Sequence, residues 1–265
     1  MFLGRSPRFN LVPDSLSILY SNDWAVLAAV FACLSIGYIL FGIAGFGAIL
    51  IVGPILLHRL PLSTVVPLLA ILDFVAAATN GLKLSSKINF SELIRLAPLM
   101  AIGTFLGTAL LIRLPTNAAA AAFGLFAIGY GIFGLLPRGD LAPIKAGWVL
   151  PIGLGGGVAS GLFGSGGFIY ALYLARRLSD KDAMRATQSS LIGLAAATRF
   201  SIFLLAGAYS DSRMIAMALA GLPALFVGLY LGHRISLWLS RDALFRVLCG
   251  ISIVTGASLI LRNFF

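Results

Sequence analysis

Residues 42–47 read Gly42-Ile43-Ala44-Gly45-Phe46-Gly47, and 119 residues later the chain reads Gly161-Leu162-Phe163-Gly164-Ser165-Gly166. A second stretch, Ala76-Ala77-Ala78-Thr79-Asn80, returns at the same offset as Ala195-Ala196-Ala197-Thr198-Arg199. Two matches at one offset predict that the chain consists of two related halves. Duplicated halves with a glycine-interrupted apolar segment at corresponding positions are typical of membrane transporters, and the interruptions indicate where a ligand binds.

The composition predicts an integral membrane protein. Hydrophobic residues make up 60% of the 265 residues and charged residues 11%, whereas about a quarter of a soluble domain is charged. Such a chain has too few polar side chains to cover a surface that faces water. We therefore expect a multi-pass protein of the inner (plasma) membrane, with lipid as its main solvent.

The net charge of +10 fits a membrane protein whose cytoplasmic loops are rich in Lys and Arg and lie next to anionic lipid headgroups. The basic residues are spread among loops without interleaved aromatics, so no nucleic acid partner is expected. The two cysteines, Cys33 and Cys249, lie in apolar segments outside any CxxC pair. We interpret them as small buried hydrophobic residues and expect neither a metal site nor a cofactor.

Apolar segments divide the chain after a short leader, residues 1–23. The first repeat is expected over residues 24–137 and the second over residues 138–265, within one membrane domain. The segments are Trp24–Phe41, Ile49–Leu57, Thr64–Leu82, Leu93–Ile112, Ala118–Leu136, Ala146–Ser160, Phe168–Leu174, Met184–Ala208, Met214–Leu231 and Ala243–Leu261.

The predicted fold is an all-α polytopic membrane protein in which each half is a glycine-broken segment plus three transmembrane helices. Ile49–Leu57 and Phe168–Leu174 are too short to cross alone, because a span needs about 20 residues. If each broken segment crosses fully, the loops carry 9 basic residues on each side. If each is re-entrant, they carry 6 and 12. The second distribution fits the positive-inside rule and makes the halves inverted, so we favour it.

Each glycine break is a candidate anion site. Glycines at i, i+3 and i+5 interrupt most helices, and an interrupted helix is tolerated in lipid where its backbone faces protein or a wet cavity. The amide groups that begin the next half-helix then attract anions. Alternatively, the glycines let helices pack closely. The candidate binding residues are Gly45, Phe46, Gly47, Gly164, Ser165, Gly166 and Gly167.

The second repeated stretch adds polar candidates on the following helix of each half. Thr79, Asn80, Thr198 and Arg199 could all bond an anion, although threonines in membrane helices often bond their own backbone. Asp73 and Arg199 are ionisable residues at membrane depth, which favours a function. Asp73 is expected to couple transport, for example to protons, or to form a structural ion pair with Arg199.

Enzymatic activity is not expected. The stretch Gly164-Ser165-Gly166-Gly167 offers Ser165 as a candidate nucleophile. No histidine lies inside a span to act as its base.

At these motifs the chain resembles the TauE/SafE family of sulfite exporters. The first family motif corresponds to residues 42–54, the second to residues 161–173, and a downstream stretch to residues 183–189. Ala48 and Tyr173 depart from the usual glycine and proline. The resemblance implies a permease for a small anion such as sulfite, an organosulfonate or a related small organic acid, working by alternating access between the two repeats. A scaffold or assembly factor remains the alternative, and a homodimer stays open.

Overall fold

The computed structural model describes residues 24–44, 48–57, 60–136, 146–235 and 241–264. This part of the chain is helical and contains no strand. Its elements are α2 (Trp24–Ala44), α3 (Ala48–Leu57), α4 (Leu62–Leu84), η2 (Ser85–Lys87), α5 (Phe90–Arg113), α6 (Thr116–Leu135), η3 (Ala146–Trp148), α7 (Val149–Phe163), α8 (Gly167–Leu174), α9 (Lys181–Leu205), α10 (Ser212–Ile235) and α11 (Arg241–Phe264).

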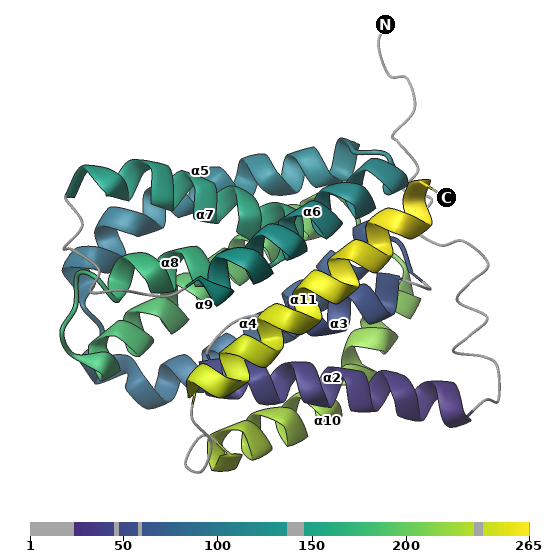
Figure 1. Ribbon diagram of the computed structural model, residues 1–265, viewed down its shortest axis with the longest axis horizontal. Helices are drawn as coiled ribbons and strands as arrows, with labels where there is room; N and C mark the ends of the chain where they lie inside the picture. The colour runs from purple at the N-terminus through teal and green to yellow at the C-terminus, as the bar shows by residue number, and fades with distance from the viewer. Residues whose placement is uncertain (1–23, 45–47, 58–59, 137–145, 236–240, 265) are drawn as a thin grey trace, which may run out of the picture.

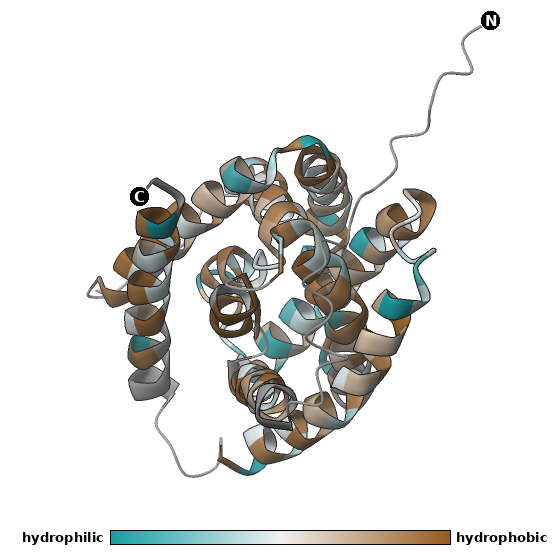
Figure 2. Cartoon of the chain, turned by 90° about the vertical axis from the view of Figure 1, so that its right-hand side faces the viewer, coloured by the Kyte–Doolittle hydropathy of each residue, from teal (hydrophilic) through white to brown (hydrophobic). Residues whose placement is uncertain are grey.

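Helix lengths and composition fit a membrane. Within the described residues, five helices are long and apolar enough to cross it, namely α4, α5, α6, α9 and α10. Shorter apolar stretches lie in α2, α3, α7 and α11. Hydrophobic residues colour most of these helices brown (Figure 2). The expectation of an all-helical membrane protein is therefore confirmed. The leader, residues 1–23, and the predicted domain boundary at residues 137–138 lie outside the described residues.

The helices pair in a regular way. α5 lies beside α7 along one edge of the molecule, and α2 lies beside α10 along the opposite edge (Figure 1). α4 packs against α9 between these edges, and α6 packs against α11. The short helices α3 and α8 lie in the interior, next to α2 and α7 respectively.

Glycines make the outer crossings possible. A Cβ atom on Gly157 or Gly161 of α7 would collide with the backbone of α5 at Met100 or Thr104. On the other edge, a Cβ on Gly42 of α2 would lie 3.3 Å from atoms of α10. The two backbones of each pair therefore touch directly, as small residues allow in membrane helices.

This packing corrects one boundary prediction. The interruptions were expected to begin at Gly42 and Gly161, but α2 continues to Ala44 and α7 to Phe163. Both glycines are helical because each is held in a close crossing with a neighbouring helix. The glycines that sequence reasoning grouped into one motif thus serve different purposes along it.

Each short helix folds back along the helix before it. A Cβ on Gly37 of α2 would meet the Val52 side chain of α3, and one on Gly156 of α7 would meet the Tyr170 ring of α8. The turn between α7 and α8 therefore lies at the tip of a helical hairpin, in the interior of the bundle. This tip positions the candidate site.

Candidate functional site

A small cavity lies where the hairpin turn between α7 and α8 meets α4 and α9. It has room for about one water molecule. Its lining includes both charged and apolar side chains. The first residues of the two short helices, Ala48 of α3 and Gly167 of α8, both contribute to it. The lining residues are Phe41, Ala48, Asp73, Ser160, Gly164, Gly167, Ile192 and Arg199.

A buried ion pair belongs to the lining of the cavity. Arg199 of α9 is 1% exposed and Asp73 of α4 is 4% exposed. The Nη2 atom of Arg199 donates to Oδ2 of Asp73 at 3.2 Å. The hydroxyl of Tyr38, from α2, donates to the other carboxylate oxygen at 3.1 Å. Three helices thus hold one carboxylate, and the pairing with Arg199 that the sequence left open is present.

The guanidinium of Arg199 is incompletely satisfied. Its Nε and Nη1 atoms are buried and have no hydrogen-bond partner among the described residues. The buried hydroxyls of Ser165 and Tyr170 also lack a partner there. Buried polar groups are nearly always hydrogen-bonded, and each exception calls for an explanation such as a bound ion or water. Two unused cationic donors beside a cavity leave a position that a water molecule or an anion can fill.

The turn at Gly164 brings the backbone against this guanidinium. Gly164 ends α7 in the left-handed conformation, with φ at 69°, and its amide donates to the Ser160 carbonyl oxygen at 2.9 Å. Glycine adopts this conformation without strain. A Cβ at this position would lie 2.5 Å from Nη1 of Arg199. The position therefore needs glycine both for its backbone conformation and for the approach of Arg199.

Helix α8 begins at the cavity. Gly167 is its first residue and lines the cavity, and no side chain caps the helix. The first turn of a helix carries a partial positive charge, and in α8 the amide of Ile169 donates to the Gly166 carbonyl oxygen at 3.0 Å. Gln188 of α9 donates to the carbonyl oxygen of Gly167 at 3.3 Å, which fixes the first turn.

The structure separates the candidate residues predicted from sequence. Gly164, Gly167, Arg199 and Asp73 line the cavity, and Ser165 and Gly166 lie between the first two in the turn. Gly45, Phe46 and Gly47 lie outside the described residues, as does the side chain of Asn80, whose backbone is in α4. Thr79 and Thr198 donate to the carbonyl oxygens of Val75 and Leu194 on their own helices, at 2.7 and 2.8 Å.

Sequence reasoning missed five residues of the site, two of which, Ala48 and Ser160, directly flank the glycine-rich stretches. Tyr38, Phe41 and Ile192 lie within uninterrupted apolar runs, where a residue that faces a cavity cannot be told from one that faces the core. Ile192 carries one available signal, because it lies 119 residues after Asp73.

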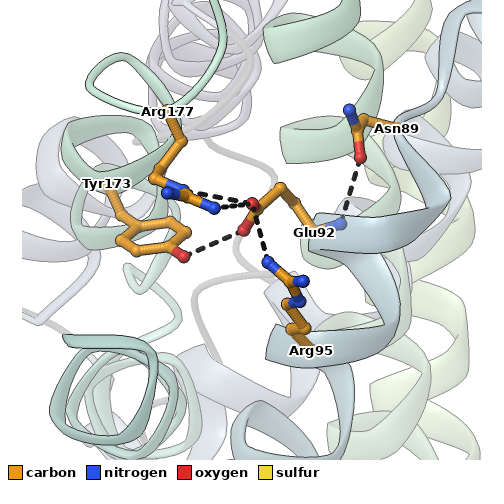
Figure 3. Close-up of polar contacts among 5 residues, drawn as sticks. All are labelled: Asn89, Glu92, Arg95, Tyr173 and Arg177. Carbon is orange, nitrogen blue, oxygen red and sulfur yellow. Dashed lines mark hydrogen bonds and ion pairs between the residues drawn. The ribbon is translucent and has the colours of Figure 1, made fainter. Parts of the chain in front are cut away.

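A second polar cluster, also missed, lies at the far end of α8. Glu92, in the first turn of α5, is 5% exposed. Its Oε1 atom accepts from Nη2 and Nε of Arg177 at 2.8 and 3.1 Å, and its Oε2 atom accepts from the Tyr173 hydroxyl at 2.9 Å. Arg95 approaches from the same helix as Glu92, at 3.5 Å (Figure 3). The hydrogen bond to Glu92 raises the pKa of Arg177, which stays cationic.

Two further contacts join the segment before α5 to the first turns of α9. Lys87 forms an exposed ion pair with Asp182, and this hydrogen bond raises the pKa of Lys87. The backbone N–H of Asn89 donates to the Thr187 hydroxyl at 2.9 Å, while the Asn89 side chain caps α5 through the Glu92 amide. We call the Glu92, Arg95, Tyr173 and Arg177 group the Glu92 cluster. It connects α5 to the end of the helix whose first residue lines the cavity.

Comparison with known proteins adds independent information. The family model described as "Sulfite exporter TauE/SafE" matches residues 29–259. The chain is 26% identical over 193 residues to "Probable inner membrane transporter protein TsaS" from Comamonas testosteroni, an alignment that covers 72% of this chain and 81% of that protein. No solved structure matches. These findings support a multi-pass membrane transporter.

Proposed function

The chain belongs to the TauE/SafE sulfite exporter family, and from this premise we propose that it is a secondary transporter of a small anion such as sulfite, an organosulfonate or a related small organic acid. The observation that carries the proposal is the buried Arg199, whose Nε and Nη1 atoms have no partner among the described residues and which lines the cavity. A buried cation at membrane depth costs several kcal/mol on the gentler scales (about 2.5–3.5), so its presence indicates a function. We place the protein in the inner membrane, as the name of its relative states for that protein.

We propose that the anion lies in the cavity that both Arg199 and the turn at Gly164 line. The guanidinium supplies two N–H donors and a positive charge. Ser165 supplies a buried hydroxyl without a described partner, and the start of α8 at Gly167 supplies backbone amides. Gly45, Phe46, Gly47 and Asn80 are proposed to contribute from the first half. Thr79 and Thr198 are the weakest candidates, because their hydroxyls already bond their own helices.

Two related halves are supported by the positions of helices and lining residues. Helix α3 begins at Ala48 and α8 at Gly167, which lie 119 residues apart, as do Leu62 and Lys181 at the starts of α4 and α9. The same offset relates three pairs of cavity residues: Phe41 and Ser160, Ala48 and Gly167, and Asp73 and Ile192.

The outer crossings give a second argument for related halves. Gly161 of α7 approaches the backbone at Thr104 and Gly107 of α5, and Gly42 of α2 approaches Leu229 and Gly232 of α10. Gly42 and Gly161 are 119 residues apart. Their partners on α5 and α10 are 125 residues apart in both cases. One contact thus corresponds to the other under exchange of the halves, with extra residues before α10. This is the arrangement expected when a site lies between inverted repeats.

Alternating access requires that the cavity be closed on one side at a time. On the side of the Glu92 cluster, a buried apolar group closes the space between α5, α8 and α9. The cluster itself joins α5 to the turn after α8. We propose that these contacts separate when the cavity opens to that side. Asp73 is proposed to couple transport by exchanging its pairing with Arg199 for a proton, which would release the guanidinium to the anion.

Reconstituted vesicles test the proposal. Arg199→Ala and Arg199→Lys should abolish uptake of sulfite and of methanesulfonate, since Ala removes the charge and Lys cannot keep one donor on Asp73 while offering others at the fixed positions of Nε and Nη1. The matched control is Arg113→Ala, which removes an exposed arginine at the end of α5 and should retain uptake. Normal uptake by both Arg199 variants, in protein that inserts and stays folded, would overturn the assignment of the site.

A scaffold or assembly factor is the second candidate, and the glycines of the outer crossings favour it. Gly42, Gly157 and Gly161 serve helix packing. Gly164 does not fit this role, because its missing side chain makes room for a guanidinium. A scaffold should show no change in melting temperature with sulfite, sulfonates or carboxylates, whereas a transporter should be stabilised by its substrate.

A further inference from the structure

One face of α6 carries a row of aromatic rings. They recur every three or four residues, a spacing that places them on the same side of a helix. They are Phe123, Phe126, Tyr130 and Phe133. Each of them packs against the ring of Phe163 or Phe168. Phe163 is the last residue of α7 and Phe168 the second residue of α8, so the row contacts both ends of the turn between these helices.

The closest contacts come from two neighbouring rings. The rings of Phe126 and Phe163 are stacked, with centroids 4.7 Å apart. The rings of Tyr130 and Phe168 meet edge to face, with centroids 4.6 Å apart. Both arrangements are among those that aromatic pairs prefer. The centroids of Phe126 and Tyr130 are themselves 6.5 Å apart, on successive turns of α6. One helix thus contacts the residue before the turn with one ring and the residue after it with the next.

From these contacts we infer that Phe126 and Tyr130 are positioning residues, which fix the two ends of the turn and so hold Gly164 and Gly167 in the lining of the cavity. We call Phe126 and Tyr130, with the two rings that they contact, the aromatic clamp. Its rings act through the turn, since none of them is among the described residues that line the cavity. The inference rests on the proposed function, because it assigns these residues a role at the proposed anion site.

The backbone hydrogen bonds that the structure shows at this turn each stay on one side of it. The Gly164 amide donates back into α7, to Ser160, and the Ile169 amide donates within the start of α8, to Gly166. The turn also lies against the guanidinium of Arg199, since a Cβ on Gly164 would be 2.5 Å from Nη1. Movement of the turn therefore changes its contact with Arg199, and misplacement by about 1 Å is enough to weaken a binding site.

The support for the clamp is α6 itself, which is held against α11. A Cβ on Gly131 of α6 would lie 2.5 Å from the Cys249 carbonyl oxygen of α11, and one on Gly124 would lie 2.9 Å from that of Gly256. The two backbones therefore touch directly. Gly124 and Phe126 are two residues apart, which places them on roughly opposite sides of a helix with 3.6 residues per turn. The rings thus project from a helix whose other side is fixed.

The residues at corresponding positions in the first half cannot form such a clamp. At the offset of 119 residues between the halves, the two rings beside the turn correspond to Ala44 and Ile49. At the offset of 125 residues between α5 and α10, the two rings of α6 correspond to Ile251 and Thr255 of α11. None of these four residues is aromatic. The clamp is therefore specific to the half that carries Arg199.

Uptake by reconstituted vesicles tests the clamp, with whichever of sulfite and methanesulfonate the wild-type protein takes up. Replacing Phe126 and Tyr130 together by Leu removes both rings and keeps apolar side chains. The KM should rise about tenfold, the scale expected when two aromatic contacts are lost, while the turnover number stays within about twofold. Tyr130→Phe keeps the ring and should retain the wild-type KM. Phe105→Leu, which removes a ring that is 56% exposed on α5, is the matched control and should leave the KM unchanged.

The split between KM and turnover separates positioning from stability. A purely structural loss lowers the amount of active protein and hence the turnover, without a change in KM. An unchanged KM in the double variant therefore overturns the clamp and leaves the transporter assignment intact, and so does a KM in Tyr130→Phe as high as that in Tyr130→Leu. If the double variant does not fold, the single variants Phe126→Leu and Tyr130→Leu decide, with a several-fold rise in KM expected of each.

Hydrogen exchange in detergent tests the clamp without transport. The amides of residues 163–170 should exchange about tenfold faster in the double variant than in wild-type protein, because local opening becomes easier, and the Phe105→Leu control should match wild type. Equal exchange in all three proteins overturns the clamp. Absence of uptake of both anions by wild-type protein overturns the proposed function instead, so the two failures are distinguishable.

Discussion

Replacing Glu92 by Gln should open the cavity toward the side on which the Glu92 cluster lies. The change keeps the size of the side chain and removes its charge. It weakens the bonds from Arg177 and Arg95, which no longer meet a carboxylate. The Tyr173 hydroxyl can still donate to the remaining carbonyl oxygen. The contact between α5 and the end of α8 is therefore weakened, while the glutamine side chain still fills the space of the glutamate.

The magnitude follows from burial and geometry. Hydrogen bonds to charged groups contribute about 1.5–3 kcal/mol each. The Glu92 side chain is 6% exposed, but Arg177 and Arg95 are 28% and 50% exposed, so solvent screens part of their attraction. We therefore expect the closed state to lose about 2 kcal/mol of stabilisation relative to the open state. At about 1.4 kcal/mol for each tenfold change, the closed state should lose about a thirtyfold preference over the open state.

Cysteine accessibility measures this shift directly. Ile192 lines the cavity and is 8% exposed. Ile192→Cys in a background without Cys33 and Cys249 should react with a membrane-impermeant thiol reagent about thirty times faster when Glu92→Gln is present. The increase is expected from the face on which Glu92 lies and not from the other.

An exposed ion pair at the same end of the molecule is the control. Lys87→Ala breaks the pair with Asp182, whose side chains are about half exposed. Exposed pairs contribute little to stability, so labelling should rise by a few-fold at most. Equal labelling of wild-type and Glu92→Gln proteins from both faces, with unchanged melting temperatures, would refute the idea that this cluster closes the cavity.

Three further substitutions test the roles of single residues. Gly161→Leu places side-chain atoms against the α5 backbone at Thr104 and should destabilise the protein by about 1–3 kcal/mol or more, seen as a lower melting temperature in detergent. Ser165→Ala removes a buried hydroxyl without a described partner; the melting temperature should hold while the KM for anion uptake rises several-fold, and an unchanged KM would exclude Ser165 from the site. Thr198→Val removes a hydroxyl bonded to Leu194 and should leave uptake within about twofold, so a large loss would restore Thr198 as a ligand.

Most of the helical architecture could be predicted from the sequence because lipid imposes simple demands. Long apolar segments must be helical, and α4, α5, α6, α9 and α10 lie where such segments were expected. The helix boundary at Gly42 was wrong because glycine acts in two ways. It interrupts a helix when nothing supports it, and it stays helical when a neighbouring backbone packs against it. Which of these happens depends on the partner helix α10, which a local pattern does not show.

The candidate site was predictable where charge made it conspicuous. Asp73 and Arg199 stand out because ionisable residues are rare in apolar segments, and the turn at Gly164 stands out through its repeated glycines. The Glu92 cluster was not predicted, because Glu92, Tyr173 and Arg177 lie near segment ends, where charged and aromatic residues are ordinary. Their significance arises from the hydrogen bonds among them, between residues more than 80 positions apart.

The proposed arrangement combines a symmetric frame with asymmetric chemistry. Position 73 carries an acid in the first half, and its counterpart in the second half is Ile192. Position 199 carries a base, and its counterpart in the first half is Asn80. A symmetric frame allows either half to move against the other. Two acids or two bases at the corresponding positions would repel each other and could not pair across the halves. With the acid on α4 and the base on α9, their pairing joins the two halves at the cavity itself. An anion that draws Arg199 away from Asp73 therefore weakens the contact between the halves at the moment it binds, which is the link between occupancy and movement that alternating access requires.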